Sequence, residues 1–577
     1  MGCDPKEIAL KSLFLGPQAE NGVWVKPLVG DLFESWFTWR KSRFPEDGAA
    51  ISAEDMQSPE FQARRKSFET GLHELISRFE GEVPKFSPRY VGHMFSEISL
   101  PALLGHVVAL LHNPNNISGE SSRVGVAIED EALQSLQRML GFGNIEARGH
   151  FTSGGTLANF EALVRARARM AHWLAAGAAS RESQASGRDL FSAAHQGWGA
   201  LPSGDKNQQS WDLFDDNPWE VGRKLSSIFG TEFRGPVVLI PENKHYSWKK
   251  GVSLVGIGAE ALWPIELDHR GKLSIPALRR LLECARTQQR PVLMVVSVAG
   301  STELGTIDPT DEVQDLLDEW ASRGYHIWHH VDAAYGGFFC SMNLAETEIL
   351  DSQSTSSLAA IRRANSVTLD PHKLGYVPYS CGAFLCRDQE DYSSKEFGAP
   401  YVQTSTSDRG PYTLEGSRAA TGATATWMTA KSIGFDSQGY GRVLERAIRI
   451  KQSLEKRFLK ADSRFRLAPH TDTNILAFSW SERGAPLSEA NTQAERIYQA
   501  LSPQGGGPFF VSKTRLFLGP YRAYLKEYLA SFESKVDTDE MTLVRVCIMN
   551  PFFGSIEMKT RFEVEFVKSL LKIIGVK

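Results

Sequence analysis

Between residues 236 and 386 the sequence alternates short, continuously apolar runs with segments of helical period. The helical segments include IPALRRLLECAR (275–286) and TDEVQDLLDEWASRG (310–324). The apolar runs are PVVLI (236–240), PVLMVVSV (291–298), HIWHHVD (326–332), SVTLD (366–370) and GAFLC (382–386). A strand that is apolar on both faces is typical of a parallel sheet covered by helices on both sides. The pattern therefore predicts an α/β domain with a largely parallel sheet.

On either side of this region the sequence has a different composition and a different apolar periodicity. DEALQSLQRML (130–140) has an acidic start and one apolar face, which predicts an amphipathic helix. The segment 175–209 is rich in Ala, Gly, Ser and Gln, so we expect a surface insertion that is partly disordered. Beyond Thr426, helical segments and strands at 474–480 and 542–550 predict a smaller α+β domain. We therefore divide the chain into a helical N-terminal segment (1–112), a large α/β domain (113–430) and a small C-terminal domain (431–577).

Charge and cysteine content argue against several classes of function. The formal net charge of −4 offers no basic surface for a nucleic-acid backbone. The six cysteines show neither metal-ligand spacing nor a dense disulfide framework, so we expect free thiols, no metal site and a cytoplasmic location. The N-terminal residues lack the apolar core of a signal peptide. The most apolar stretch, ISLPALLGHVVALL (98–111), is too short to span a bilayer, and we expect no membrane partner.

Polar residues follow several predicted strands, at the edge where functional groups of open α/β sheets gather. The turn SGGT (153–156) opens an apolar-periodic helix, where backbone N–H groups suit a phosphate; a simple capped loop is the alternative. His245, in PENKHYSWKKG, follows PVVLI and is either a ring-stacking residue or an ordinary core or surface histidine. Ser301 and Thr302 follow the next strand, where an ST-turn is the simple alternative.

Two charged residues complete the set. Asp332 ends a hydrophobic strand, and a buried carboxylate there needs a cationic partner, either in a ligand or in a structural salt bridge. Lys373, in DPHK, follows another buried strand; a desolvated amine bonds covalently to carbonyl compounds, unless the side chain simply extends to solvent. One cofactor, pyridoxal 5′-phosphate, accounts for all of these groups. It offers a phosphate for the SGGT turn, a flat ring for His245, a pyridine nitrogen for Asp332 and an aldehyde for Lys373.

The motifs resemble those of the group II pyridoxal-phosphate-dependent amino acid decarboxylases, and within that family they are most similar to the bacterial tyrosine decarboxylases. The likeness covers most of the chain and rests on LFLGPQAENG, YVGHMFSEISLPALL (90–104), HNPNN (112–116), KHYSW, GSTELG, HVDAAYGG, SVTLDPHKLGYVPYS, TLEGSR (413–418) and VRVCIMNPF (544–552). It implies the fold type I arrangement of pyridoxal-phosphate enzymes. In that α/β arrangement a large, mostly parallel seven-stranded sheet lies between an N-terminal helical segment and a smaller α+β domain.

The resemblance also implies a role for each site residue. Lys373 would hold the cofactor covalently, and Asp332 would bind the protonated ring nitrogen. Thr302 would lie near the phenolic oxygen of the cofactor or the substrate carboxylate. His245 and Ala334 would pack on the two faces of the ring. The phosphate contacts would come from Ser153, Gly154, Gly155, Thr156 and His372.

In the family that the chain resembles, a tyrosine on a mobile loop reaches across a dimer interface and protonates the substrate carbanion. The polar, Gly- and Pro-containing segment 395–412 fits that loop, and Tyr401 is the expected donor in preference to Tyr392. Such a loop requires a homodimer with two-fold symmetry, in which the helical segment 1–112 would supply the interface.

The expected reaction is the loss of the carboxylate of an L-amino acid as CO2, which leaves the amine. An aromatic, tyrosine-like substrate is expected, in a pocket around His93, Tyr379 and Cys547. The sequence departs from the tyrosine decarboxylases at Cys547 and Asn550, so phenylalanine, tryptophan, dihydroxyphenylalanine or an acidic amino acid stay open. Another lyase or aminotransferase reaction on the same scaffold and a non-catalytic cofactor-binding protein are further alternatives.

Overall fold

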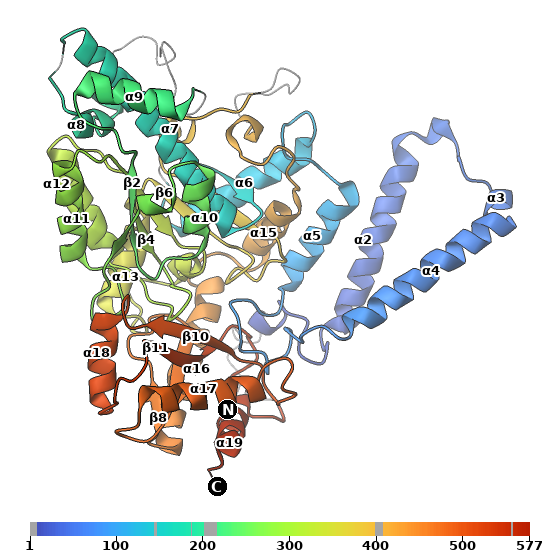
Figure 1. Ribbon diagram of the computed structural model, residues 1–577. Helices are drawn as coiled ribbons and strands as arrows, with labels where there is room; N and C mark the ends of the chain where they lie inside the picture. The colour runs from blue at the N-terminus through green and yellow to red at the C-terminus, as the bar shows by residue number, and fades with distance from the viewer. Residues whose placement is uncertain are drawn as a thin grey trace.

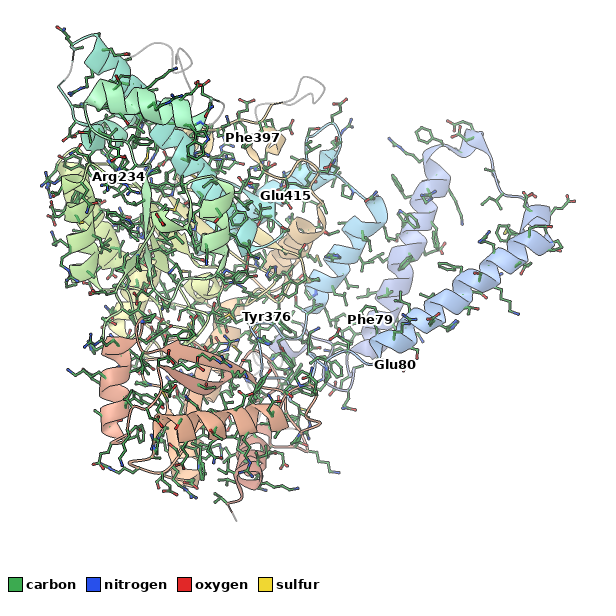
Figure 2. The ribbon with its side chains drawn as sticks, viewed as in Figure 1. Phe79, Glu80, Arg234, Tyr376, Phe397 and Glu415 are labelled. Atoms are coloured by element: carbon green, nitrogen blue, oxygen red, sulfur yellow. The ribbon has the colours of Figure 1, made fainter. Side chains whose placement is uncertain are left out.

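The computed structural model describes residues 9–143, 147–185, 187–200, 216–398, 408–555 and 558–576. Near its start, helices α2 (Gly22–Arg43) and α4 (Pro59–Phe79), linked through α3 (Ala53–Gln57), project away from the rest of the chain (Figure 1). Ser58 caps α4 by accepting a hydrogen bond from the backbone N–H of Phe61. Yet α4 buries none of its residues and α2 buries only Val25. Large apolar side chains of this arm stay exposed in the described chain, such as Phe79 at the end of α4 (Figure 2).

A seven-stranded sheet forms the centre of the large domain. Its strands are β1 (Arg148–Thr152), β2 (Val237–Pro241), β3 (Leu262–Ile265), β4 (Val292–Val298), β5 (His329–Asp332), β6 (Ser366–Leu369) and β7 (Gly382–Cys386). They lie in the order β1-β7-β6-β5-β4-β2-β3, with β3, β2, β4, β5 and β6 parallel and β7 antiparallel to both of its neighbours. All five apolar runs are strands, so the predicted, largely parallel sheet is confirmed.

Helices cover both faces of this sheet. The helices of the large domain and its entry are α5 (Leu100–His112), α6 (Arg123–Met139), α7 (Gly155–Glu182), α8 (Leu190–Ala194), α9 (Pro218–Phe229), α10 (Ser247–Leu254), α11 (Ile275–Thr287), α12 (Thr310–Ser322), α13 (Ser352–Ala360), α14 (Gln389–Tyr392) and α15 (Thr421–Ser432). Successive side chains of β2 show the two layers, because a strand alternates its faces. Val237 and Leu239 pack with α11 and α12, whereas Val238 and Ile240 pack with α7 and α10.

The prediction of a surface insertion at 175–209 is wrong for the first part of that segment. Helix α7 continues to Glu182, and Ala175 and Ala178 are buried in it. A Cβ on Gly177 would lie 2.5 Å from the Cβ of Ala193 in α8, so the small residues permit close helix packing. Alanine-rich sequence is also strongly helix-forming. The composition therefore reflects packing at this point rather than disorder, while 201–215 lie outside the described residues.

The C-terminal part is an antiparallel sheet in the order β10-β11-β9-β8 with helices against it. Its elements are β8 (Phe465–Leu467), β9 (Ile475–Trp480), β10 (Ser512–Phe517), β11 (Glu540–Cys547), α16 (Tyr440–Ala461), α17 (Leu487–Ala500), α18 (Arg522–Ser531) and α19 (Phe562–Ile574). The strands predicted at 474–480 and 542–550 are β9 and β11. Arg545 of β11 donates a hydrogen bond to the backbone carbonyl of Thr302, which joins this part to the large domain.

A search of the described ranges for a membrane-crossing helix found none with the necessary length and apolar character.

Candidate active site

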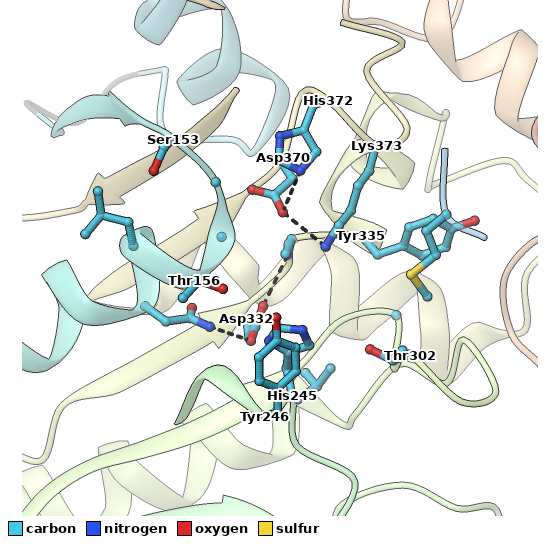
Figure 3. A pocket seen from close by; sticks show the side chains of 18 of the residues that line it. Ser153, Thr156, His245, Tyr246, Thr302, Asp332, Tyr335, Asp370, His372 and Lys373 are labelled. Atoms are coloured by element: carbon cyan, nitrogen blue, oxygen red, sulfur yellow. Dashed lines mark hydrogen bonds and ion pairs between the residues drawn. The ribbon is translucent and has the colours of Figure 1, made fainter. Parts of the chain in front are cut away.

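A cavity of about 400 Å³ opens at the carboxyl ends of the parallel strands (Figure 3). The loops after β1, β2, β4, β5 and β6 meet there because the carboxyl ends of parallel strands share one edge of the sheet. Most of the predicted site residues line it: Ser153, Gly154, Gly155, Thr156, His245, Thr302, Asp332, Ala334, His372, Lys373 and Tyr379. The fold thus gathers residues that are widely spaced in the sequence.

The start of α7 forms one wall of the cavity. Gly155 is the first residue of this helix, and the first backbone N–H groups of a helix have no partner within it. A Cβ on Gly155 would lie 2.8 Å from Oδ2 of Asp370 and 3.1 Å from the Cβ of Ala334, so the packing requires glycine. Ser153 and Thr156 place hydroxyl groups along the same wall. Together these donors suit a phosphate group.

Asp332 is the last residue of β5 and is only 6% exposed. Its Oδ2 accepts hydrogen bonds from Asn159 Nδ2 at 2.9 Å and Trp248 Nε1 at 3.1 Å, and Oδ1 accepts one from the backbone N–H of Ala334 at 3.4 Å. Among the described residues no cationic side chain forms an ion pair with it, so the structural salt bridge considered for Asp332 is not present there. A buried carboxylate that faces a cavity and is held by neutral donors fits a cationic ligand group.

Lys373 follows β6, and its Nζ lies 3.0 Å from Oδ2 of Asp370, which is 2% exposed. Burial alone raises the pKa of Asp370, but the Lys373 ammonium and the His372 ring outweigh it, so this pKa lies below its ordinary value. His372 is fixed because its Nδ1 accepts a hydrogen bond from the backbone N–H of Cys381 at 3.0 Å. Asp370 Oδ1 is buried and has no hydrogen-bond partner within the described ranges. Lys373 therefore extends into the cavity rather than to solvent (Figure 3).

His245 lies on the loop after β2 at the cavity wall. Its ring centroid is 4.3 Å from that of Tyr246, and its Nδ1 lies 2.8 Å from Oγ of Ser247. Burial, which the carboxylate of Asp332 only partly offsets, lowers the pKa of His245. The ring is therefore neutral at neutral pH, and a neutral flat ring suits stacking.

The structure separates two predicted substrate residues from the cavity wall. His93 Nδ1 is 3.3 Å from Nη2 of Arg545, and Cys547 is 1% exposed at the end of β11. Neither is among the residues that line the cavity. Tyr379 does line it, and its ring stacks on that of His372 with 4.1 Å between centroids. Tyr401 lies outside the described residues.

Sequence reasoning missed several residues that shape the site. Asp370 and Trp248 belong to the DPHK and KHYSW motifs that supplied Lys373 and His245, so the signal was present but no role was given to them. Asn159 lies one turn into α7, where a polar side chain in a buried helix is the available signal. Met94 and Tyr335 also line the cavity.

Known proteins are similar to this sequence over nearly its whole length. Residues 232–481 match the family model described as the pyridoxal-dependent decarboxylase conserved domain. An L-tyrosine decarboxylase of Levilactobacillus brevis is 30% identical over 96% of this chain and 94% of its own. The chain belongs to the pyridoxal-dependent decarboxylase family. A further relative of this pyridoxal-dependent decarboxylase is an L-tyrosine decarboxylase of Enterococcus faecium, which is 28% identical over 98% of this chain and 99% of its own.

The fold of the decarboxylase is also that of solved structures. Mouse CSAD in apo form matches with a TM-score of 0.63 at 19% identity, over 96% of this chain and 100% of that one. Oryza sativa TDC with PLP and tryptamine matches with a TM-score of 0.63 at 16% identity, over 96% and 98%. The predicted fold type I arrangement and enzyme class are confirmed. The protein is a pyridoxal-phosphate-dependent amino acid decarboxylase, a carboxy-lyase.

The residues of the cavity fit the cofactor of this family. The start of α7 offers N–H donors for its phosphate. Asp332 is a buried anion without a cationic partner in the described chain, which fits a protonated ring nitrogen. Lys373 brings an amine to the centre of the cavity, which fits the aldehyde.

Proposed function

We propose that this decarboxylase acts on an aromatic, tyrosine-like L-amino acid and releases the corresponding amine and CO2. One observation carries the proposal: relatives named L-tyrosine decarboxylase match the chain over nearly its whole length. Relatives named L-2,4-diaminobutyrate decarboxylase and aspartate 1-decarboxylase match with 22% and 26% identity over 84% and 77% of the chain. The side chains of Met94, Tyr335 and Tyr379 along the cavity agree with an aromatic substrate.

The proposed roles of the cavity residues follow from their positions. Lys373 holds the cofactor through its Nζ, and Asp370 Oδ2, 3.0 Å away, orients the lysine side chain toward the cavity. Asp332 keeps the ring nitrogen protonated by offering it an anion in a buried site. His245 and Ala334 pack on the two ring faces, and the start of α7 binds the phosphate.

When bound, pyridoxal 5′-phosphate supplies an aldehyde for the substrate amine and a ring that takes up the electron pair left by the departing carboxylate. The chain supplies orientation and proton transfer. Thr302 lies where it orients the substrate carboxylate, and the stacked rings of His372 and Tyr379 close one side of the cavity. Tyr401 would deliver the proton to Cα of the substrate, and Lys373 would hold the cofactor again once the amine has left.

Product analysis tests the proposal. Cofactor-supplemented enzyme is incubated with each of the twenty amino acids, and CO2, amine and keto acid are measured. We expect CO2 and amine in equal amounts from tyrosine, and no turnover in Lys373→Ala. Preference for aspartate or diaminobutyrate would refute the aromatic substrate, whereas keto acid as the main product would refute decarboxylation.

We further propose a homodimer in which each subunit completes the site of the other, with residues 1–112 as the dimerisation segment. The arm formed by α2 and α4 supports the homodimer, because helices of this length need packing against another surface to be stable. Large apolar side chains remain exposed along α2 and α4: Phe33, Phe37, Phe68, Leu75 and Phe79. Equilibrium ultracentrifugation tests the stoichiometry, and a monomer at micromolar concentration would refute it.

We also propose a cytoplasmic location. Cys284, Cys340, Cys381, Cys386 and Cys547 are all free thiols, which suits a reducing compartment. Cell fractionation with an antibody against the protein tests the location, and recovery in the secreted or membrane fraction would refute it.

A further inference from the structure

Asn159, one turn into α7 and 1% exposed, contacts Asp332 directly and is linked to His245 through Ser247. Its Nδ2 donates one hydrogen to Oδ2 of Asp332 at 2.9 Å and the other to Oγ of Ser247 at 3.2 Å. Ser247 in turn lies 2.8 Å from Nδ1 of His245. The side chain therefore joins the carboxylate at the end of β5 to the imidazole after β2.

The orientation of this amide is determined by its surroundings. Turned around, its oxygen would meet the Asp332 carboxylate, and two acceptors would face each other with no hydrogen between them. In the observed orientation Oδ1 accepts a hydrogen bond from Thr368 Oγ at 2.7 Å instead. Strands β5 and β6 pair Asp332 with Thr368, which places both beneath Asn159.

The direction of each hydrogen bond behind Asn159 is fixed as well. The indole nitrogen of Trp328 is only a donor and lies 2.8 Å from Oγ of Ser366. Nε2 of His330 lies 3.2 Å from Oδ1 of Asn159, an amide oxygen that only accepts, so the ring carries its hydrogen on Nε2. Nδ1 of His330 then accepts from the Ser366 hydroxyl, 2.7 Å away. The burial of His330 lowers its pKa to about 4, so the ring stays neutral in this chain of hydrogen bonds.

A second branch runs to the cavity. Ser247 Oγ accepts from Asn159, so the hydroxyl hydrogen is available for Nδ1 of His245. The backbone N–H of Ser247 faces the same nitrogen at 3.3 Å. Because Nδ1 accepts twice, the neutral His245 ring carries its hydrogen on Nε2.

The two oxygens of Asp332 are consequently unequal. Oδ2 accepts from two side-chain donors, Asn159 and Trp248, whereas Oδ1 accepts only the 3.4 Å contact from the backbone of Ala334. Donors that occupy one oxygen leave the other oxygen available as an acceptor. The buried network thus presents a single oriented acceptor to the cavity.

We propose that Asn159 is a positioning residue that fixes the Asp332 carboxylate and directs its Oδ1 to the ring nitrogen of the cofactor. The inference rests on the proposed assignment of Asp332 to that nitrogen. Asn159 itself acts only through Asp332, and the chain Trp328–Ser366–His330 fixes the amide from behind.

The test measures the affinity of cofactor-free protein for two probes by equilibrium dialysis. The probes are pyridoxal 5′-phosphate and its carbocyclic analogue, in which C–H replaces the ring nitrogen. The bond to Lys373 and the phosphate contacts are common to both, so they cancel in the ratio of the two dissociation constants. We expect the wild-type protein to prefer pyridoxal 5′-phosphate, and Asn159→Asp to lose about tenfold of that preference, because two adjacent carboxylates share a proton.

A matched control variant distinguishes a positioning role of Asn159 from a general loss of structure. Asn116 is also 1% exposed and donates from Nδ2 to the buried Glu129 at 2.9 Å, but it does not line the cavity. Asn116→Asp makes the same chemical change beside a buried carboxylate and should leave the ratio unchanged. Thr368→Val, which removes the donor to Asn159 Oδ1 and a 3.3 Å contact with Nε2 of His330, provides a milder variant if Asn159→Asp does not fold. We expect it to lose about threefold of the preference.

The outcomes distinguish this inference from the proposed function. A wild-type preference that Asn159→Asp or Thr368→Val retains in full would overturn the role of Asn159 and leave the function standing. An equal loss in Asn116→Asp would overturn it too. A wild-type protein that binds both probes equally, or neither, would instead overturn the assignment of Asp332 to the ring nitrogen.

Discussion

Replacing Lys373 by alanine should destabilise the cofactor-free protein as well as abolish turnover. The ammonium lies 3.0 Å from the carboxylate of Asp370, which is 2% exposed and depends on it as a counter-ion. Removal of one partner from a buried ion pair costs ~3–5 kcal/mol. The Lys373 side chain is 21% exposed, and the first turn of α7 still faces Asp370 in the variant, so part of the loss is offset. We expect the free energy of unfolding to fall by about 2 kcal/mol at pH 8.

The pH dependence identifies the cause. In the wild-type protein the pKa of Asp370 is lowered, so its contribution to stability is complete above the unfolded-state value of about 4 and is lost as the pH falls through the folded value. In Lys373→Ala the burial of Asp370 raises its pKa instead. The cost of the substitution is then largest at pH 8 and shrinks toward pH 5, because the carboxyl takes up a proton.

Urea unfolding of four cofactor-free proteins measures the effect: wild type, Lys373→Ala, Asp370→Asn and the double variant. With Asp370 already neutral, removal of Lys373 should cost little, so the double variant should be more stable than the sum of the single changes predicts. Additive losses, or a loss in Lys373→Ala that is the same at pH 5 and pH 8, would show that the ion pair is not the cause.

Four further changes test other parts of the molecule. Asp332→Asn should still bind the cofactor but lower kcat at least a hundredfold in a CO2-release assay, since a charge-assisted hydrogen bond worth ~3 kcal/mol is lost; an undiminished kcat would exclude its role. Tyr401→Phe should retain cofactor absorbance and slow amine formation, and full activity would remove Tyr401 from the reaction. His329→Gln should become more stable relative to wild type as the pH falls from 7.5 to 5: the difference between their free energies of unfolding in urea should change by about 2 kcal/mol in favour of the variant. The reason is that burial lowers the pKa of His329 to about 3, while the same residue takes up a proton below about pH 6.5 in the unfolded wild-type chain. A constant difference would contradict that shift. Phe37→Glu on α2 should convert the proposed dimer into monomer in ultracentrifugation, and a dimer that persists in the variant would place the interface elsewhere.

The sequence reveals those parts of the fold whose signal is local. The central strands are apolar on both faces because helices cover both sides of them, so their runs are visible without a structure. The edge strands β1 and β3 were missed: LWPI is short, half-exposed and contains Pro264, which leaves no continuous apolar pattern. The alanine-rich end of α7 was misjudged because its small residues are explained only by the helix that packs on them.

The residues of the candidate site also fall into two groups, those that the sequence reveals and those that only the structure reveals. Asp332 and Lys373 are recognisable because each ends an apolar strand within a motif. Asn159 and Trp248 are not, because their roles depend on reaching Asp332 from two other segments of the chain. Cys547, expected in the substrate pocket, is buried at the end of β11, and its role in substrate binding stays a prediction. Motifs indicate which chemistry is present, whereas the partners that tune it are set by tertiary contacts.

The arm formed by α2 and α4 has a consequence for handling the protein. Since these helices bury almost nothing against their own chain, their ordered state would gain its stability from association in the proposed dimer, and association obeys mass action. The thermal midpoint should therefore rise with protein concentration, and dilute preparations should lose the arm to proteases before the sheet domain unfolds.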